Sequence, residues 1–251
     1  MSKFSLNTTS DYSLNFDQKK RRANQIKYIV FHYTGMRSEV EAIKKLKNIK
    51  SKVSSHYLIK KNGKIINLVP DLYIAWHAGI STWRKKKFLN RYSIGIEITN
   101  PGHEFNYRNF SKKQIYSTLK LSRFLVKKYK IKNNSILGHS DIAPDRKKDP
   151  GEKFPWKFLA KNKIGYWHNL DEKHVSKKRK KKISSSGKNK FKKNLLSIGY
   201  AKNSQKIKKD YLKLITTAFQ RRFRPILVNG IIDEECLLIS ENIVKKFKKI
   251  T

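Results

Sequence analysis

The sequence has little cysteine, little acid and no long apolar run. Its single cysteine, Cys236, cannot form a disulfide within one chain, and we expect it to be a small buried hydrophobe. No segment approaches the ~20 apolar residues that span a bilayer. The N-terminal 25 residues lack an apolar run of signal-peptide length. These absences exclude an internal disulfide framework and predict a soluble chain that is not exported.

The scarcity of acid leaves a large positive charge. The chain has 59 Lys and Arg against 18 Asp and Glu, a formal net charge of +41. Such an excess favours polyanionic partners such as nucleic acid, anionic lipid or an anionic cell-wall polymer. The alternative is a lysine-rich composition on an ordinary solvated surface. An apolar fraction of 38%, with 12% aromatic residues, is too high for a disordered chain, so we expect folded domains.

Strand and helix patterns alternate in the first part of the chain. The first strand pattern is rich in β-branched and aromatic residues, and Asn62-Gly63 stands between two apolar stretches as in a β-hairpin. Strands are expected at 26–34, within 55–70, at 92–99 and at 134–140, and helices at 38–50 and 111–130. This alternation predicts an α/β fold with a mixed central β-sheet flanked by helices.

The composition changes near residue 171. Residues 171–193 are rich in lysine and serine, have little to bury, and are expected to form a solvated linker. Beyond them, amphipathic patterns interrupted at Pro225 and Gly230 predict a small helical bundle. The predicted organisation is a domain at 1–170, the linker at 171–193 and a helical domain at 194–251.

Three residues could form a hydrolytic metal site, which needs His, Asp, Glu or Cys ligands and one open position for water. His32 ends the first strand pattern, His139 lies beside the last one, and Asp149 follows in a proline-containing loop. The alternative for each histidine is a hydrogen-bonded structural role, and the alternative for the loop is a capped turn.

Glu97 lies in an apolar strand pattern, where a carboxylate costs free energy unless it is paired, exposed or functional. Gly95 would leave room for a ligand on the same face. Near a metal, Glu97 could act as a general base, and Lys147, two residues from Asp149, could face a developing oxyanion. The alternatives are a solvent-facing carboxylate and a chance lysine in a lysine-rich chain.

The chain resembles the zinc-dependent N-acetylmuramoyl-L-alanine amidases of the type 2 amidase family, relatives of peptidoglycan recognition proteins. It does so in five ordered motifs: "FHYTGM", "SSHYLI", "AWHAGISTWR", "LNRYSIGIEITNPG" and "LGHSDIAPDRKKDPGEKFPW". The similarity covers roughly residues 12–168. The later segments "AFQRRFRP" and "NGIID" resemble a small peptidoglycan-binding domain found beside such amidases, with a generic helical bundle as the alternative.

The resemblance implies specific roles for the candidate residues. His32, His139 and Asp149 would bind Zn²⁺, Glu97 would activate water, and Lys147 would stabilise the tetrahedral intermediate. All five matching positions are occupied, which favours catalysis over a wall-binding role alone.

Four further positions match the part of the family that shapes the substrate groove. They are Trp76, His77, Arg84 and Asn90. The resemblance implies substrate contacts there, with packing roles as the alternative.

The implied activity is zinc-dependent hydrolysis of the amide bond between N-acetylmuramic acid and L-alanine in peptidoglycan or muropeptides, during bacterial cell-wall turnover or recycling. A non-catalytic peptidoglycan-binding or sensing module is one alternative. A basic nucleic-acid-binding protein is another, but no recognition motif supports a specific nucleic acid. We expect a monomer in the cytoplasm, because no signal peptide is present; the wall-binding resemblance favours a periplasmic or cell-wall-associated location instead.

Overall fold

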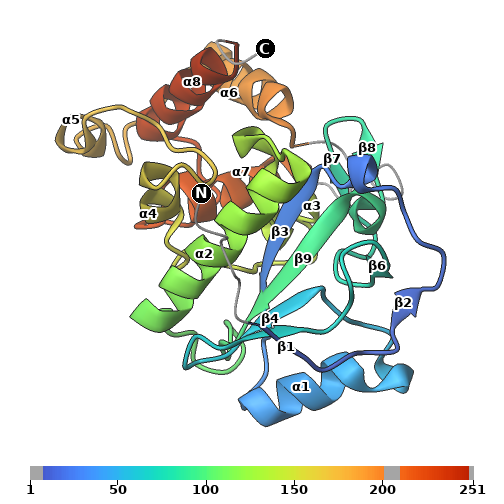
Figure 1. Cartoon of the computed structure of the whole chain (residues 1–251). Helices are drawn as coiled ribbons and strands as arrows, with labels where there is room; N and C mark the ends of the chain where they lie inside the picture. Colours follow the sequence, from blue (N-terminus) through green and yellow to red (C-terminus); the bar gives the residue numbers. More distant parts are fainter. Residues whose placement is uncertain (1–7, 201–209, 249–251) are drawn as a thin grey trace.

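A mixed six-stranded β-sheet lies at the centre of the computed structural model, which describes residues 8–200 and 210–248 (Figure 1). The strand order is β1-β5-β4-β9-β3-β10. The bounds are β1 Thr8–Ser10, β3 Tyr28–Tyr33, β4 Tyr57–Ile59, β5 Ile65–Asn67, β9 Ser93–Ile98 and β10 Ile136–Gly138. β9 runs parallel to β3 and β4, and β10 runs parallel to β3, whereas β4 and β5 form the predicted antiparallel hairpin. The predicted α/β fold with a mixed central sheet is confirmed.

Two pairs of very short strands flank this sheet. β2 (Phe16–Asp17) pairs with β6 (Ile74–Ala75), and β7 (Thr82–Trp83) pairs with β8 (Lys86–Lys87). Each strand has two residues, too few for a period-two pattern to be recognised in the sequence.

Alternate residues of β3 face two different cores, because side chains alternate across a strand. Ile29 and Phe31 are fully buried in a core that includes Leu121 and Leu125 of α2 (Lys112–Tyr129). Val30 points to the other face and belongs to a second core. His32 follows Val30 on that second face, so the predicted site residue lies at the edge of the second core.

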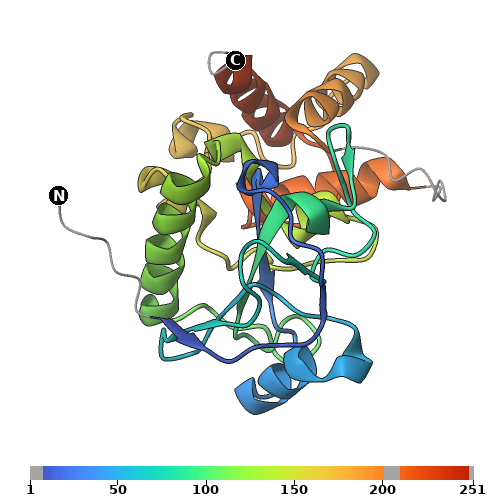
Figure 2. The ribbon, with the colours of Figure 1, turned by 45° about the vertical axis from the view of Figure 1, so that its right-hand side comes forward.

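The helices begin where the sequence supplies caps. Ser38 caps α1 (Glu39–Lys47), and Ser111 caps α2 while the Gln114 side chain accepts from the Ser111 backbone. α2 covers one face of the sheet, and α1 lies at the opposite end of the molecule from α6 and α8 (Figures 1 and 2). The helices predicted at 38–50 and 111–130 are thus present.

The lysine- and serine-rich tract is more ordered than the linker predicted at 171–193. It contains α5 (Glu172–Ser176) and the larger part of α6 (Ser185–Ile198). The expectation that this tract has little to bury does not hold at Phe191, which is fully buried and recurs at helical spacing with Leu195 and Ile198 beyond the tract.

The last helices, α6, α7 (Tyr211–Phe223) and α8 (Glu234–Lys248), are called the C-terminal helices below. Their apolar side chains share the second core with Val30 of β3 and Leu137 of β10. The predicted domain boundary at residue 194 stays a proposal, and residues 1–7, 201–209 and 249–251 of the predicted domains lie outside the described residues. Within the described residues, no helix combines the length and apolar character needed to cross a bilayer.

Candidate metal and catalytic site

The parallel pairing of β3 and β10 brings two of the predicted ligands together. His32 lies near the carboxyl end of β3, and His139 is the first residue of α3 (His139–Ile142), directly after β10. The carboxyl ends of parallel strands meet at the same edge of a sheet. The two Nδ1 atoms are 2.9 Å apart, and both side chains are buried.

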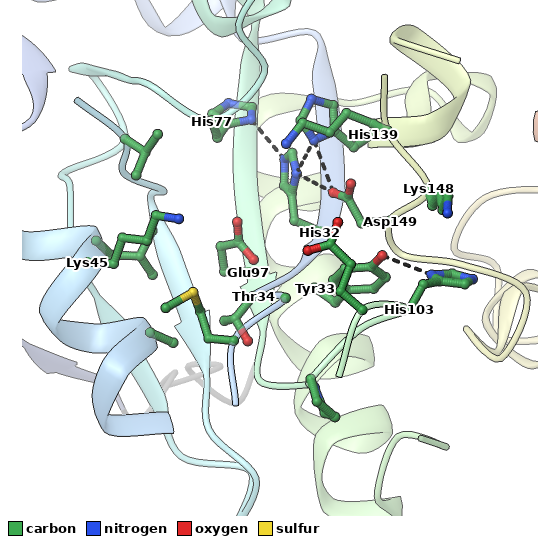
Figure 3. Close-up of a pocket in the computed structure, with 18 of the residues that line it drawn as sticks. His32, Tyr33, Thr34, Lys45, His77, Glu97, His103, His139, Lys148 and Asp149 are labelled. Carbon is green, nitrogen blue, oxygen red and sulfur yellow. Dashed lines mark hydrogen bonds and ion pairs between the residues drawn. The ribbon is translucent and has the colours of Figure 1, made fainter. Parts of the chain in front are cut away.

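Asp149 completes this group from a loop that folds back over α3. Its backbone carbonyl accepts a hydrogen bond of 2.8 Å from the Ser140 amide. Its carboxylate oxygen Oδ2 is 2.9 Å from His32 Nδ1 and 3.0 Å from His139 Nδ1 (Figure 3). His32, His139 and Asp149, called the candidate metal site below, are buried and offer three ligand atoms within 4.8 Å of one another.

Hydrogen bonds to the far side of His32 assign its tautomer. Ser93 Oγ donates to the Leu89 carbonyl at 2.6 Å, so it accepts from His77 Nε2, 3.2 Å away. His77 Nδ1 is then an acceptor for His32 Nε2, at 3.0 Å. This series of hydrogen bonds leaves a lone pair on His32 Nδ1, which faces the candidate metal site.

The ring of His139 is oriented from its far side as well. Its Nε2 is 3.2 Å from the carbonyl oxygen of Ala78, which can only accept, so Nε2 is the donor and Nδ1 is the nitrogen that faces the candidate metal site. Burial, and next the proximity of His139, lower the pKa of His32 to about 4, so its imidazole is neutral near pH 7.

A divalent cation fits the three converging atoms. His32 Nδ1, His139 Nδ1 and Asp149 Oδ2 lie 2.9, 2.9 and 3.0 Å from one another, so with both imidazoles neutral their lone pairs would converge on a point where a positive charge is stabilised. Burial would raise the pKa of Asp149, but interactions with His139 and then His32 hold it well below its usual range. Two imidazoles, each oriented by a hydrogen bond at its other nitrogen, together with one carboxylate are a ligand set that suits a catalytic Zn²⁺.

Glu97 lies beside this group because β9 pairs with β3. Its backbone position is in register with His32, so both side chains project from the same face of the sheet. The carboxylate oxygen Oε2 is buried without a hydrogen-bond partner among the described residues. Burial, and next the negative charge of Asp149, raise the pKa of Glu97 to about 8. A carboxylate held in this way is more basic than usual, which suits a general base.

Lys147 lies on the same cavity as Glu97 and the candidate metal site. This cavity has a volume of about 330 Å³, and Lys147, Lys45 and Arg146 bring positive charge to its wall. The charge of Lys147 lowers the pKa of Glu97 and so opposes part of the effect of burial. The structure therefore brings all five residues of the predicted metal and catalytic set to one cavity.

The expected ligand space above Gly95 is filled by a side chain instead. A Cβ atom at Gly95 would lie 2.4 Å from Cγ of His77. Glycine at this position thus allows the His77 ring to reach His32, and the prediction of a free ligand space is wrong. His77 also borders the cavity, but its hydrogen bonds go to His32 and Ser93.

The other three predicted substrate contacts lie in different places. Trp76 borders the cavity, and its indole nitrogen donates to Asp17 at 2.7 Å. Asn90 is not among the described residues that line the cavity; its side-chain oxygen accepts from the backbone amides of His77 and Ala78, at 3.1 and 2.7 Å. It therefore holds the segment that carries His77.

Arg84 is not among the described residues that line this cavity, and its predicted contact with substrate stays a prediction. It has a left-handed backbone with φ of 52°, and its amide donates to the Gly199 carbonyl at 2.8 Å. This geometry turns the exposed side chain toward α8, where the guanidinium carbon lies 5.7 Å from the Phe247 ring centre.

The sequence did not predict a polar network that borders the cavity of the candidate metal site. The Tyr33 hydroxyl is 2.9 Å from His103 Nδ1, and His103 Nε2 is 3.0 Å from the Glu152 carboxylate (Figure 3 shows the first contact). Tyr33 and His103 both line the cavity. A signal was available, because Tyr33 directly follows His32 and His103 follows the strand that carries Glu97.

The chain is similar to known amidases over most of its length. Residues 22–152 match the family model described as N-acetylmuramoyl-L-alanine amidase. The N-acetylmuramoyl-L-alanine amidase AmiD of Escherichia coli is 35% identical over 236 residues, covering 89% of this chain and 84% of that protein. The 1,6-anhydro-N-acetylmuramyl-L-alanine amidase AmpD of Haemophilus influenzae is 40% identical over 106 residues, covering 42% of this chain and 55% of that protein.

Solved structures show the same likeness over most of the chain. E. coli AmiD, in complex with the substrate anhydro-N-acetylmuramic acid-L-Ala-D-gamma-Glu-L-Lys, matches with a TM-score of 0.77 and 34% identity, covering 89% of this chain and 90% of that one. AmpDh3 of Pseudomonas aeruginosa matches with a TM-score of 0.77 and 28% identity, covering 99% of this chain and 98% of that one.

Proposed function

Since the chain belongs to the N-acetylmuramoyl-L-alanine amidase family, we propose that it uses zinc to hydrolyse the amide bond between N-acetylmuramic acid and L-alanine in muropeptides or peptidoglycan. The observation that carries this proposal is the convergence of three lone-pair donors, Glu97 and Lys147 on one cavity. A module that only binds the wall has no need of this set.

His32, His139 and Asp149 would hold the ion through Nδ1, Nδ1 and Oδ2. Bound zinc supplies a Lewis acid that polarises the scissile carbonyl and lowers the pKa of water toward ~7. Glu97 would take a proton from the attacking water and hand it to the leaving nitrogen of L-alanine. Lys147 would donate to the oxygen that gains negative charge in the tetrahedral intermediate.

Metal analysis with a product assay tests this proposal. Purified protein is expected to contain about one zinc per chain, as a single catalytic site requires. Treatment with a chelator should remove both the metal and the release of stem peptide from muropeptides, and added Zn²⁺ should restore both. Full hydrolysis by protein that contains no metal would contradict the zinc mechanism.

We further propose that soluble anhydro-muropeptides are substrates. The support is the likeness to AmiD, whose solved complex contains an anhydro-N-acetylmuramic acid peptide, and to AmpD, which is named for a 1,6-anhydro substrate. Rates on purified anhydro-muropeptides and on intact sacculi, compared at equal enzyme concentration, test this preference. The cytoplasmic location and the monomeric state stay predictions, to be tested by cell fractionation and by light scattering.

The C-terminal helices are proposed to contact glycan. The support is a second cavity of about 340 Å³ between α4 (Trp156–Lys161), α7 and α8, which is lined by aromatic and aliphatic side chains such as Trp167 and Ile226. Ile226 is 73% exposed. Ile226→Asp, made in a Glu97→Gln background that preserves the polymer, should reduce co-sedimentation with sacculi. Ile231→Asp, at a 64% exposed position outside the lining, is the matched control. Equal binding by both variants would contradict this role.

A further inference from the structure

A buried ion pair joins the C-terminal helices to the segment that carries His139. Arg222 Nη1, on α7, lies 2.5 Å from Asp141 Oδ2, on α3, and both side chains are only 1% exposed. Asp141 is two residues from His139, whereas Arg222 lies far outside the residues 22–152 that match the family model. The pair therefore connects two parts of the chain that the family motifs do not relate.

The pair fixes the backbone at both ends of β10, the strand that directly precedes His139. Asp141 Oδ2 accepts from the Gly138 amide at 2.8 Å, and Arg222 Nη2 donates to the Ile136 carbonyl at 2.8 Å. Tyr200, which follows α6, donates from its hydroxyl to Asp141 Oδ1 at 2.7 Å. The C-terminal part of the chain thus holds the start of β10 directly, through Arg222, and holds its end at Gly138 through the Asp141 carboxylate.

Aromatic rings hold the guanidinium of Arg222 in one orientation. Its central carbon lies 4.2 Å from the Trp156 ring centre and 4.7 Å from the Tyr166 ring centre. Trp156 in turn packs close to Gly138, because a Cβ atom there would lie 3.2 Å from the indole ring. A planar guanidinium in an aromatic pocket can make two directed hydrogen bonds with little freedom to move.

Stability alone does not explain such a pair. Removing two charges from water costs several kcal/mol per ion, and well-packed apolar residues are often as stable in the same place. What the charged pair adds is direction, since it fixes Gly138 and Ile136 relative to α7. The residue that directly follows Gly138 is His139, whose Nδ1 must point at the candidate metal site.

We propose that Arg222 is a positioning residue of the metal site: through Asp141 and the Ile136 carbonyl, the C-terminal helices set the orientation of His139. This inference rests on the proposed zinc site. It gives the C-terminal helices a second role beside the proposed contact with glycan, as a part of the catalytic unit.

Metal binding by the full chain tests the inference. Arg222→Met keeps an unbranched apolar side chain and loses the guanidinium with its directed hydrogen bonds. Affinity for Zn²⁺, measured by chelator competition, is expected to fall about tenfold, the lower end of the loss for a direct outer partner of a ligand, because Arg222 acts on His139 through Asp141 and the backbone. The visible absorption of bound Co²⁺, which reports donor geometry, should shift as well.

Arg224→Met is the matched control. Arg224 follows α7, is equally buried and pairs with Asp233 at 2.9 Å, but it makes no contact with the segment around His139 in the described structure. The control should lose stability while its Zn²⁺ affinity and Co²⁺ spectrum stay as in the wild type. An equal loss of affinity in both variants would mean a general effect on packing and would overturn the proposal.

A second variant guards against misfolding caused by an unpaired aspartate. Asp141→Asn combined with Arg222→Met leaves no buried charge, and it is expected to fold with Zn²⁺ affinity still about tenfold below the wild type. Wild-type affinity and spectrum in the double variant, or failure of both variants to fold, would overturn the positioning role. Absence of Zn²⁺ binding by the wild type would instead overturn the proposed function.

Discussion

The candidate metal site and the C-terminal helices are both buried, but they bury different kinds of group. The site buries two histidines and a carboxylate, and beside them Oε2 of Glu97 is buried with no hydrogen-bond partner in the described structure. The C-terminal helices bury apolar side chains such as Phe219, and arginines that are paired with carboxylates. The difference teaches that burial of the site residues destabilises the folded state, while packing of the C-terminal helices stabilises it.

This contrast has a structural basis in the sheet. Val30 and His32 are two residues apart on the same face of β3, yet one belongs to the core shared with the C-terminal helices and the other to the cavity. The apolar core therefore begins where the site ends. Substitutions in the two regions are expected to separate activity from stability.

Replacement of Glu97 should have the largest effect, and it should fall on activity. Glu97→Gln keeps the shape of the side chain but cannot accept a proton, so kcat is expected to fall about 10²- to 10⁴-fold. The free energy of unfolding should stay close to the wild-type value, because glutamine has the same shape and the raised pKa of Glu97, about 8, leaves its carboxyl group mostly uncharged near pH 7. Steady-state assays and urea unfolding measure the two quantities.

Glu41→Gln is the control for this comparison, because Glu41 is an exposed residue of α1. Its activity and stability should both match the wild type. Loss of stability in Glu97→Gln, in parallel with loss of activity, would break the contrast between the two regions.

Replacement of Phe219 should have the opposite profile. Phe219 is fully buried on α7 between Phe191 and Phe223, with ring centres 5.3 and 5.1 Å away. Phe219→Ala is expected to lower the free energy of unfolding by about 3–5 kcal/mol. Because the second core is shared, tryptophan fluorescence and far-ultraviolet circular dichroism should report one coincident transition.

The control is Tyr116→Ala, an aromatic residue of α2 that is 62% exposed, which should change stability by about 0.5 kcal/mol or less. Two separate transitions in the wild type would show that the C-terminal helices fold as an independent unit. The shared core would then not couple the two regions.

Much of the sheet and of the site could be predicted because the relevant signals are local. The alternation around Glu97 predicts which face of β9 carries the carboxylate, and the strand pattern ending at His32 predicts where the first ligand lies. The use of the space above Gly95 could not be predicted, because His77 reaches it from a separate segment.

The role of the C-terminal helices was harder to predict for the same reason. Arg222 meets Asp141 across 81 residues of sequence, and no spacing rule relates them. The buried face of α6 was hidden as well, since Phe191 and Leu195 are surrounded by lysines and serines that lower the average hydropathy of the segment. Tertiary packing, rather than local pattern, decided both outcomes.

Replacement of Asp71 tests whether the loss of stability depends on the part of the molecule that holds a residue or on the contacts that the residue makes. It lies within the sheet-containing part of the chain and is 7% exposed, and it accepts hydrogen bonds from Tyr57, Tyr129 and Lys128 at 2.6, 2.6 and 2.8 Å. Asp71→Asn is expected to cost about 3 kcal/mol, the lower end for a broken buried pair, because the Lys128 side chain is 46% exposed and partly screened.

The contribution of Asp71 to the free energy of unfolding should depend on pH. Burial raises the pKa of Asp71, but the hydrogen bonds from Lys128, Tyr129 and Tyr57 outweigh it, so the net shift is downward. A carboxyl group whose pKa is lowered by folding stabilises the folded state at pH values above its pKa in the unfolded chain, about 3.9. This contribution is lost as the pH falls toward the lower pKa of the folded state. The difference between wild type and Asp71→Asn should be constant from about pH 5 to 8 and shrink in more acidic solution. A constant difference down to about pH 2 would contradict this account.

The smallest effect is expected at an exposed pair within the C-terminal helices. Lys190 on α6 and Glu241 on α8 are 2.6 Å apart, with side chains 64% and 24% exposed. Lys190→Met should change the free energy of unfolding by about 1 kcal/mol or less, and the change should vanish in high salt, because solvent screens such pairs. If urea unfolding instead shows a loss comparable with that of Phe219→Ala, the stability of these helices comes from their surface charges. In that case the shared apolar core would not be what joins them to the sheet.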